Sequence, residues 1–314
     1  MSDSVDLLRK KIGKVRTLGS VVRTMKTLAS LNIRQYEESV RSLADYNHTI
    51  ELALAGSMKS GHRSYFGPET PGKKQSVMAA IVFGSDQGLV GQFNDHLAGL
   101  VKDRFDGSAE SRHIMVVGEQ IRLRLALSGM VAESSFGVPG SVNAITWLVG
   151  DLLMAIEQLS EKASLRELRM FYNTPSGGGL YQSVSMRLLP LDDSWERDTL
   201  GRNLWPTKTI PDLPGGQDMT RWALVREYLF VSIFRVCAES LAAENASRLA
   251  AMQRAGKNID EMLEELSRHY RERRQARIDE ELFDVVSGFN ALTGKSWKER
   301  SSGDLLRDAS KSPV

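Results

Sequence analysis

The chain has 314 residues, of which 41% are hydrophobic and 7% aromatic, and its formal net charge is +2. This length permits more than one domain, while the near-neutral charge argues against a chain that is a polycation as a whole. The one cysteine, Cys237, cannot form an internal disulfide, so we expect a reducing, intracellular setting and a packed, unreactive thiol. The N-terminus lacks the apolar segment of a signal peptide, and the most apolar helical stretch, 223–238, carries charges, so we expect no membrane span.

A first long helix is predicted from about Asp6 to Lys59. Its apolar residues recur every three or four positions, the spacing of one helix face. This stripe consists of Leu8, Ile12, Val15, Val22, Met25, Ala29, Tyr36 and Leu43.

The same helix is strongly basic, with eight basic and no acidic residues from Arg9 to Arg34. Three interpretations follow: a solvated face, a polyanion site, or a contact with acidic loops of a protein partner. Nucleic-acid sites usually combine basic residues with aromatics or a groove-reading motif, and only Tyr36 lies nearby. Nucleic acid is therefore the least favoured of these partners.

The middle of the chain, at about 74–211, is predicted to be a separate α/β domain, preceded by a loop rich in glycine and proline at 61–72. The predicted strands are Val77–Phe83, Ile114–Val117, Leu168–Tyr172 and Tyr181–Leu189, and the predicted helices are Gln92–Arg104, Glu119–Ser128 and Val142–Ser160. Strands that alternate with helices indicate a parallel or mixed sheet.

A second long helix is predicted from near Gln217, with Asp218 and Thr220 as candidate caps, to at least Ser287. No proline occurs between Pro214 and Pro313, and proline in a helix interior costs about 3 kcal/mol. From Met252 the apolar spacing approaches a heptad, with Met252, Ala255, Ile259, Met262 and Leu266. This register predicts a coiled coil with the N-terminal helix, which would make the central domain an insertion between the two helices.

The heptad stops at an arginine-rich stretch, Arg268–Arg277, which contains five arginines and His269. A helix that is polar all round is marginal in isolation, so something else must surround it. Beyond it the apolar residues resume at Ile278, Leu282, Phe283, Val285 and Val286. This tip, apolar on several sides, predicts an enclosing sleeve.

No motif in the chain predicts catalysis, a cofactor or a metal. Gly294-Lys295-Ser296 lacks the earlier glycine and the preceding strand of a phosphate loop. The Gly84–Gly91 segment follows a strand and opens a helix, but its glycine spacing is wrong for a dinucleotide loop, which favours a tight structural turn. The five histidines are scattered without metal-ligand spacing, and no nucleophile-elbow serine is present.

Over residues 5–292 the chain resembles the gamma subunit of rotary ATP synthases. The matching blocks are Leu8–Val15 with Thr24–Ser30, the turn Ser85–Asn94, and Glu239–Met252 with Arg274–Leu282. The resemblance implies an α+β fold: a long antiparallel coiled coil of N- and C-terminal helices with an inserted α/β (Rossmann-like) domain. The corresponding segments are 1–60, 74–211 and 215–292, followed by a charged flexible tail at 293–314.

The resemblance also implies a rotor subunit that is not itself an enzyme and couples ion (hydrogen ion) transport to ATP synthesis. One copy would serve each complex, with its tip inside a ring of alpha and beta subunits and its α/β domain against the epsilon subunit and the membrane c-ring. The implied location is peripheral, on the cytoplasmic face of a bacterial inner membrane. Implied beta-subunit contacts are Met25, Lys26, Arg248, Arg274 and Gln275, and Asp86, Gly88 and Gly91 belong to the structural turn.

The chain departs from the family pattern at Gln87, Val90 and Gln92 of the turn and at Lys26, and it continues beyond the usual end near Leu292. These departures favour a divergent or alternative form of the synthase. The competing hypothesis from another class is a non-rotary coiled-coil interaction scaffold that carries an α/β module.

Overall fold

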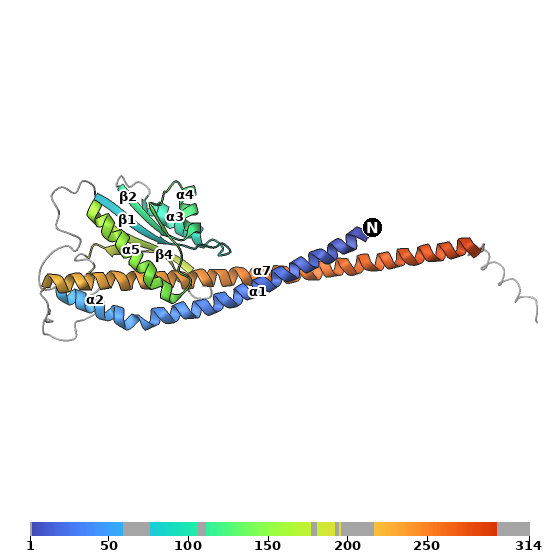
Figure 1. Cartoon of the computed structure of the whole chain (residues 1–314), viewed down its shortest axis with the longest axis horizontal. Coiled ribbons are helices and arrows are strands. Elements are labelled where there is room, and N and C mark those ends of the chain that lie inside the picture. Colours follow the sequence, from blue (N-terminus) through green and yellow to red (C-terminus); the bar gives the residue numbers. More distant parts are fainter. Residues whose placement is uncertain are drawn as a thin grey trace, which may run out of the picture. The chain divides into compact units, whose positions relative to one another are not determined.

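The computed structural model of the chain describes residues 2–58, 76–105, 111–176, 181–191, 195 and 217–293. The chain divides into two compact units, Arg23–Arg254 and the pair of segments Met1–Val22 and Ala255–Val314. The elements are α1 (Ser2–Ser42), α2 (Ala44–Met58), β1 (Ser76–Phe83), α3 (Phe93–Phe105), β2 (Ser111–Val117), α4 (Glu119–Leu127), β3 (Ser134–Phe136), α5 (Val142–Lys162), β4 (Ser164–Pro175), β5 (Tyr181–Leu189) and α7 (Gln217–Thr293) (Figure 1).

Five strands form one mixed sheet in the order β3-β2-β1-β4-β5. β1 is central and parallel to both β2 and β4, so that Val82 lies opposite Val116 on one side and Phe171 on the other. β3 continues the sheet in parallel, and β5 closes the other edge antiparallel to β4. The predicted mixed α/β sheet is therefore present. β3 was not predicted, because its three residues are half-buried or exposed and form no apolar run.

Helices cover both faces of this sheet, and β1 supplies side chains to each face in alternation. Met78, Ala80 and Val82 pack with α3 and α4. Ala79, Ile81 and Phe83 pack with α5 and with parts of α2 and α7 on the other face (Figure 1). A central strand buried on both sides explains why 77–83 reads as an unbroken apolar run.

α5 begins after Ser141, whose hydroxyl accepts a hydrogen bond from Ala144 N at 3.4 Å. Within the described residues it is the helix that is long and apolar enough to cross a membrane, with a mean hydropathy of 1.2. Its buried residues are Ile145, Leu148, Val149, Leu152, Leu153, Ile156 and Leu159, all within the core of the unit Arg23–Arg254 or at its edge. The apolar character of α5 thus serves the core, and the sequence prediction was wrong to take 223–238 as the most apolar candidate.

The N-terminal helix is broken at Leu43, contrary to the prediction of one helix from Asp6 to Lys59. Just before the break, the hydroxyls of Ser39 and Ser42 donate to the carbonyls of Gln35 and Ser39, each at 2.9 Å. Serine hydroxyls that bond to the carbonyls of the preceding turn compete with the helix ladder and bend helices. The apolar periodicity of the sequence continues across Leu43, so the sequence pattern did not indicate the break.

Within the unit Arg23–Arg254, the N-terminal helices run antiparallel to α7. Three hydrogen bonds define the direction: Asn32 Nδ2 to Asn245 Oδ1 at 3.3 Å, Tyr46 Oη to Glu227 Oε1 at 2.7 Å, and Arg221 Nη2 to the Ser57 carbonyl at 2.8 Å. Residue numbers rise along one partner as they fall along the other. Cys237 is fully buried in this core, and burial raises the pKa of its thiol.

In the other unit, α1 and α7 also run antiparallel, with Arg16 beside Leu263–Arg271 and Val22 beside Gly256. Ile12, Val15 and Val22 are buried on α1, and Ile259 and Leu266 on α7. One register prediction was wrong, because Met262 is 45% exposed while Leu263 is half-buried. A full helical turn takes 3.6 residues, so Leu263, four residues after Ile259, lies more nearly on the same side of the helix as Ile259 than Met262, three residues after it.

Several predicted features lie outside the described residues. They are the loop at 61–72, Gly294-Lys295-Ser296 and the tail at 293–314 apart from Thr293.

Candidate partner-contact site

The predicted structural turn after β1 is a tightly bonded segment. The Asp86 carboxylate accepts hydrogen bonds from Glu119 N at 2.9 Å and from Val138 N at 2.8 Å, so it joins the turn to α4 and to the loop before α5. Leu89 and Gly91 have positive φ angles of 64° and 59°. Gly88, in contrast, has open space around it, and its φ angle is not positive. The geometry therefore does not require glycine at this position of the predicted turn.

The same turn is closed by Asn94 at the start of α3. The amide of Ser85 donates to Asn94 Oδ1 at 3.1 Å, and Asn94 Nδ2 donates to Ser85 Oγ at 2.9 Å. Gly84 is a steric necessity, because a Cβ there would lie 2.3 Å from Ile121 Cβ of α4. These contacts support the interpretation of the segment as a structural turn.

Two serines of α7 bond to the backbone of this segment. Ser240 Oγ donates to the Phe83 carbonyl at 3.1 Å, and Ser247 Oγ donates to the Val90 carbonyl at 2.5 Å. Ala243, between them on α7, packs with Val90 and Phe93. Neither serine was predicted to have a role. Because they are seven residues apart in a helix, the sequence indicated that both lie on one face. It did not indicate which segment that face contacts.

Arg248, one of the predicted partner contacts, is engaged inside the chain. Its Nη2 donates to Glu244 Oε1 at 2.5 Å, and the two side chains are only 13% and 6% exposed. Burial raises the pKa of Glu244, Arg248 acts in the opposite direction, and the Asp86 carboxylate adds to the rise. Glu244 was not predicted from the sequence, although an acid four residues before an arginine on a helix is the usual pattern of an ion pair.

Of the two predicted contacts on α1, Met25 is half-buried and Lys26 is exposed. Leu28 and Leu31 close by are 54% and 62% exposed, and neither belongs to the buried stripe of α1. Met25, Leu28 and Leu31 follow one another at three-residue spacing along α1, whereas Lys26 faces another side of the helix. The leucines were not predicted as site residues, because the predicted contacts came from the family resemblance, which singled out only Met25 and Lys26 on this helix.

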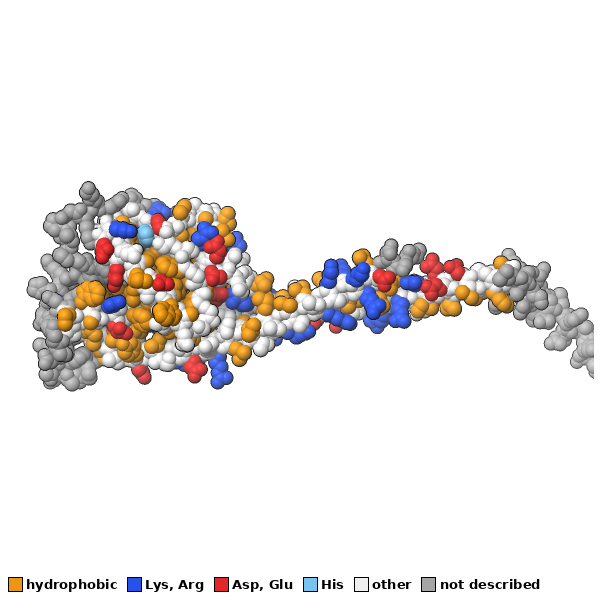
Figure 2. All heavy atoms as spheres, viewed as in Figure 1, with side chains coloured by type: hydrophobic (Ala, Val, Ile, Leu, Met, Phe, Trp, Pro, Cys, Tyr) orange, Lys and Arg blue, Asp and Glu red, His pale blue; other side chains and the backbone are white. Residues whose placement is uncertain are grey.

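Arg274 and Gln275 are both exposed on α7, where Gln275 Nε2 donates to Asp279 Oδ1 at 2.9 Å. Every residue from Arg271 to Phe289 is exposed in the structure. The exposed apolar side chains of this tip are Ile278, Leu282, Phe283, Val285, Val286 and Phe289. Figure 2 shows hydrophobic and charged side chains gathered along this part of the helix.

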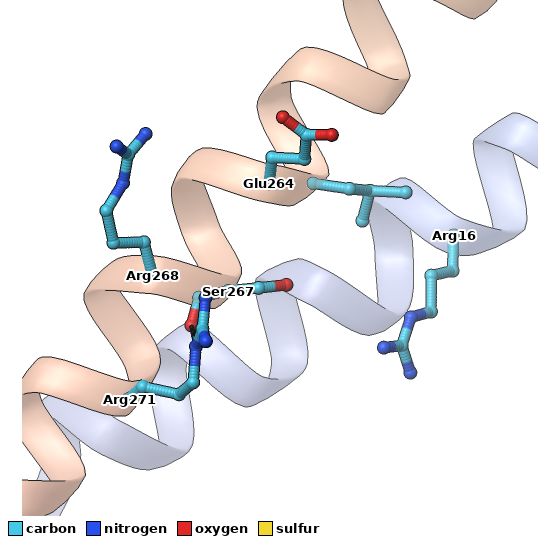
Figure 3. A pocket seen from close by; sticks show the side chains of 6 residues that line it. Arg16, Glu264, Ser267, Arg268 and Arg271 are labelled. Atoms are coloured by element: carbon cyan, nitrogen blue, oxygen red, sulfur yellow. Dashed lines mark hydrogen bonds between the residues drawn. The ribbon is translucent and has the colours of Figure 1, made fainter.

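Besides a hollow of about 510 Å³ lined by Asp6, Arg9 and Lys10, the described surface has two further hollows large enough to hold a ligand. The first is an open pocket of about 470 Å³, lined by Arg16, Leu263, Glu264, Ser267, Arg268 and Arg271. The guanidinium groups of Arg16 and Arg268 point away from each other (Figure 3), so they do not converge on an anion. Among the described residues, no group of three or more His, Cys, Asp or Glu could hold a metal ion.

The second hollow is a groove of about 810 Å³ between α5 and the first turns of α7. Its lining includes Met154, Met219 and Trp222, of which Trp222 is 57% exposed. Hydrophobic side chains gather over these two helices on the face seen in Figure 2. An exposed apolar patch of this kind is typical of a protein–protein contact.

Known proteins resemble this chain along most of its length. A family model described as ATP synthase matches residues 4–292. Among solved structures, a chain of the Euglena gracilis mitochondrial ATP synthase (OSCP/F1/c-ring, rotational state 3) has a TM-score of 0.64 at 13% identity, with 94% of this chain and 96% of that chain covered.

Two further structures share the fold. A chain of the Euglena gracilis mitochondrial ATP synthase rotor has a TM-score of 0.59 at 14% identity over 88% of this chain and 100% of that chain. A chain of the Tetrahymena thermophila mitochondrial ATP synthase central stalk/c-ring has a TM-score of 0.51 at 17% identity over 75% of this chain and 99% of that chain. The family match and the shared fold cover nearly the whole chain.

Proposed function

Because the chain belongs to the gamma-subunit family of ATP synthases, we propose that its exposed helix tip turns inside a ring of alternating alpha and beta subunits. The observation that carries this proposal is the exposure of α7 from Arg271 to Phe289. A single helix with both arginines and large apolar side chains in solvent is poorly stable alone, so it needs a surrounding protein.

The tip is suited to contacts that form and break repeatedly. Its charge pairs, such as Arg277 Nε to Glu281 Oε1 at 3.0 Å, are exposed and lie within one helix. Exposed ion pairs contribute about 0–1 kcal/mol each, so no single angle of the shaft would become a deep energy minimum. Arg274 and Gln275 would contact the inner surface of beta from this tip.

On α1, Met25 and Lys26 would meet an acidic mobile loop of beta. Lys26 supplies the opposite charge, and Leu28 and Leu31 leave further apolar area more than half exposed on another side of the helix. Arg248 would influence coupling indirectly, through its buried pair with Glu244, instead of by touching beta.

The shaft would act without any catalytic group of its own. As it turns, each beta subunit would meet a different face of the rod and would be biased toward a different conformation. The α/β domain would dock on the epsilon subunit and the membrane c-ring, and the apolar groove at Met154 and Trp222 supports a protein contact there. The chain would then be a peripheral subunit on the cytoplasmic face of a bacterial inner membrane, in one copy per complex and without nucleic acid.

Reconstitution with the alpha and beta subunits of a bacterial ATP synthase tests this proposal. We expect one copy of the chain to co-purify with each ring of three alpha and three beta subunits and to raise its ATPase activity. Three copies per ring, or no association, would contradict the rotor role. Association that leaves ATPase activity unchanged would favour the non-rotary scaffold.

A further inference from the structure

We propose that Ser240 and Ser247 carry the turning force between the α/β domain and the α7 shaft. This inference rests on the proposed rotor function and names the contact through which that function would operate. Both serines act as positioning residues, because they hold two parts of the rotor together and touch no partner subunit.

The two hydroxyls bond to the backbone just before the turn and near its end. Ser240 donates to the carbonyl of Phe83, the last residue of β1, and Ser247 donates to the carbonyl of Val90, near the end of the turn. The four residues are 1–6% exposed, so water does not compete for these bonds. A buried hydrogen bond has a preferred direction and distance, and it resists sliding in a way that apolar packing alone does not.

The turn is itself rigidly attached to the sheet. Asn173 of β4 donates from Nδ2 to the Phe93 carbonyl at 3.1 Å, and Asp86 ties the turn to α4 and the loop before α5. β1, which leads into the turn, is the central strand and is paired on both sides. A force applied anywhere on the sheet would therefore reach the two serines through bonded structure.

The opposite side of α7 is linked to α1 at the same level. Asn245, between the two serines in sequence, receives a hydrogen bond from Asn32 Nδ2 at 3.3 Å. It also donates to the Leu241 carbonyl at 2.8 Å, which fixes the orientation of its amide. The serine contacts thus connect the domain to a helix that is already joined to its partner helix, so the pair would turn with the domain.

The test uses the complete complex in sealed membrane vesicles, with the double variant Ser240→Ala, Ser247→Ala. ATP hydrolysis and ATP-driven ion uptake are measured together, with and without an opposing ion gradient. We expect hydrolysis to stay within about twofold of the parent complex, and ion uptake per ATP against the gradient to fall at least threefold. The loss should be smaller without the opposing gradient, because less force then passes through the contact.

Ser232→Ala is the matched control. Ser232 is a serine of α7, 2% exposed, that lies beside Tyr228. This variant removes a buried hydroxyl from the same helix, so it should lower the melting temperature without changing ion uptake per ATP. If Ser232→Ala lowers that ratio as much as the double variant does, general destabilisation explains the effect and the inference is wrong.

Other outcomes separate this inference from the rotor function itself. Failure of the parent chain to assemble or to couple would overturn both. A parent complex that couples, with an unchanged uptake ratio in the double variant, would overturn the inference alone. If the double variant does not assemble, the single variants Ser240→Ala and Ser247→Ala decide the question by the same ratio.

Discussion

The buried pair of Glu244 and Arg248 allows a quantitative prediction about stability. Replacing Arg248 by alanine leaves the Glu244 carboxylate, in a residue 5% exposed, without its cation. Breaking a buried ion pair by removing one partner typically costs about 3–5 kcal/mol. We expect Arg248→Ala to lower the free energy of unfolding at pH 8 by about 3 kcal/mol, the lower end of this range, because protonation of Glu244 limits the cost.

The pKa of Glu244 determines how the loss of stability in Arg248→Ala changes with pH. Burial already raises the pKa of Glu244 above its ordinary value, and Arg248 opposes that rise, so the variant should raise the pKa further. A carboxyl with a folded-state pKa above its unfolded value contributes stability below the unfolded pKa, and this contribution is lost as pH rises through the folded pKa. The destabilisation by Arg248→Ala should therefore be smaller at pH 5 than at pH 8.

Urea unfolding of the parent and variant chains at pH 5, 6, 7 and 8 measures this difference. The control is the double variant Glu244→Gln, Arg248→Met, which replaces both charges with neutral side chains of similar size. Such replacements of buried pairs are often neutral or stabilising, so the double variant should recover most of the lost stability. A cost independent of pH, or a double variant as unstable as Arg248→Ala, would refute the reasoning.

Three further predictions concern the turn, the tip and the tail. Gly84→Ala would place a Cβ 2.3 Å from an α4 atom and should cost about 1–3 kcal/mol in thermal unfolding, whereas Gly88→Ala, with open space around it, should be nearly neutral. Replacing Arg274 and Gln275 together by alanine should reduce activation of the alpha/beta ring while circular dichroism shows the same helix content; equal loss of both would make these residues structural. Truncation after Leu292 should leave assembly with the ring intact, and loss of co-purification would show that the tail is required.

The sequence predicted the elements whose signal is local. The proline-free stretch and the apolar periodicity indicated α7, and an apolar run indicated β1. β3 escaped because a three-residue edge strand has no such run. The break at Leu43 escaped because the apolar period continues unchanged across it.

The interactions of the candidate site were harder to predict because they join distant segments. The residues of each serine hydrogen bond, Ser240 with Phe83 and Ser247 with Val90, are 157 positions apart. Serine on a helix is ordinarily solvated or bonded to its own backbone, so its identity alone does not predict a bond to another element. Arg248 was predicted from resemblance as a partner contact, but its burial against Glu244 depends on packing that one sequence does not display.

The two kinds of interaction along α7 differ in the way that a rotor requires. At Ser240 and Ser247, buried donors meet fixed carbonyls, so displacement would leave polar groups unsatisfied in a dry interior. From Arg271 to Phe289, the side chains are exposed, and charge pairs such as Arg277 with Glu281 lie within the helix itself. Such a surface can exchange one partner face for another at small cost, because water solvates the exposed charges whenever a partner side chain moves away. A static scaffold would gain nothing from this difference, since it would benefit from specific, buried interactions at both places.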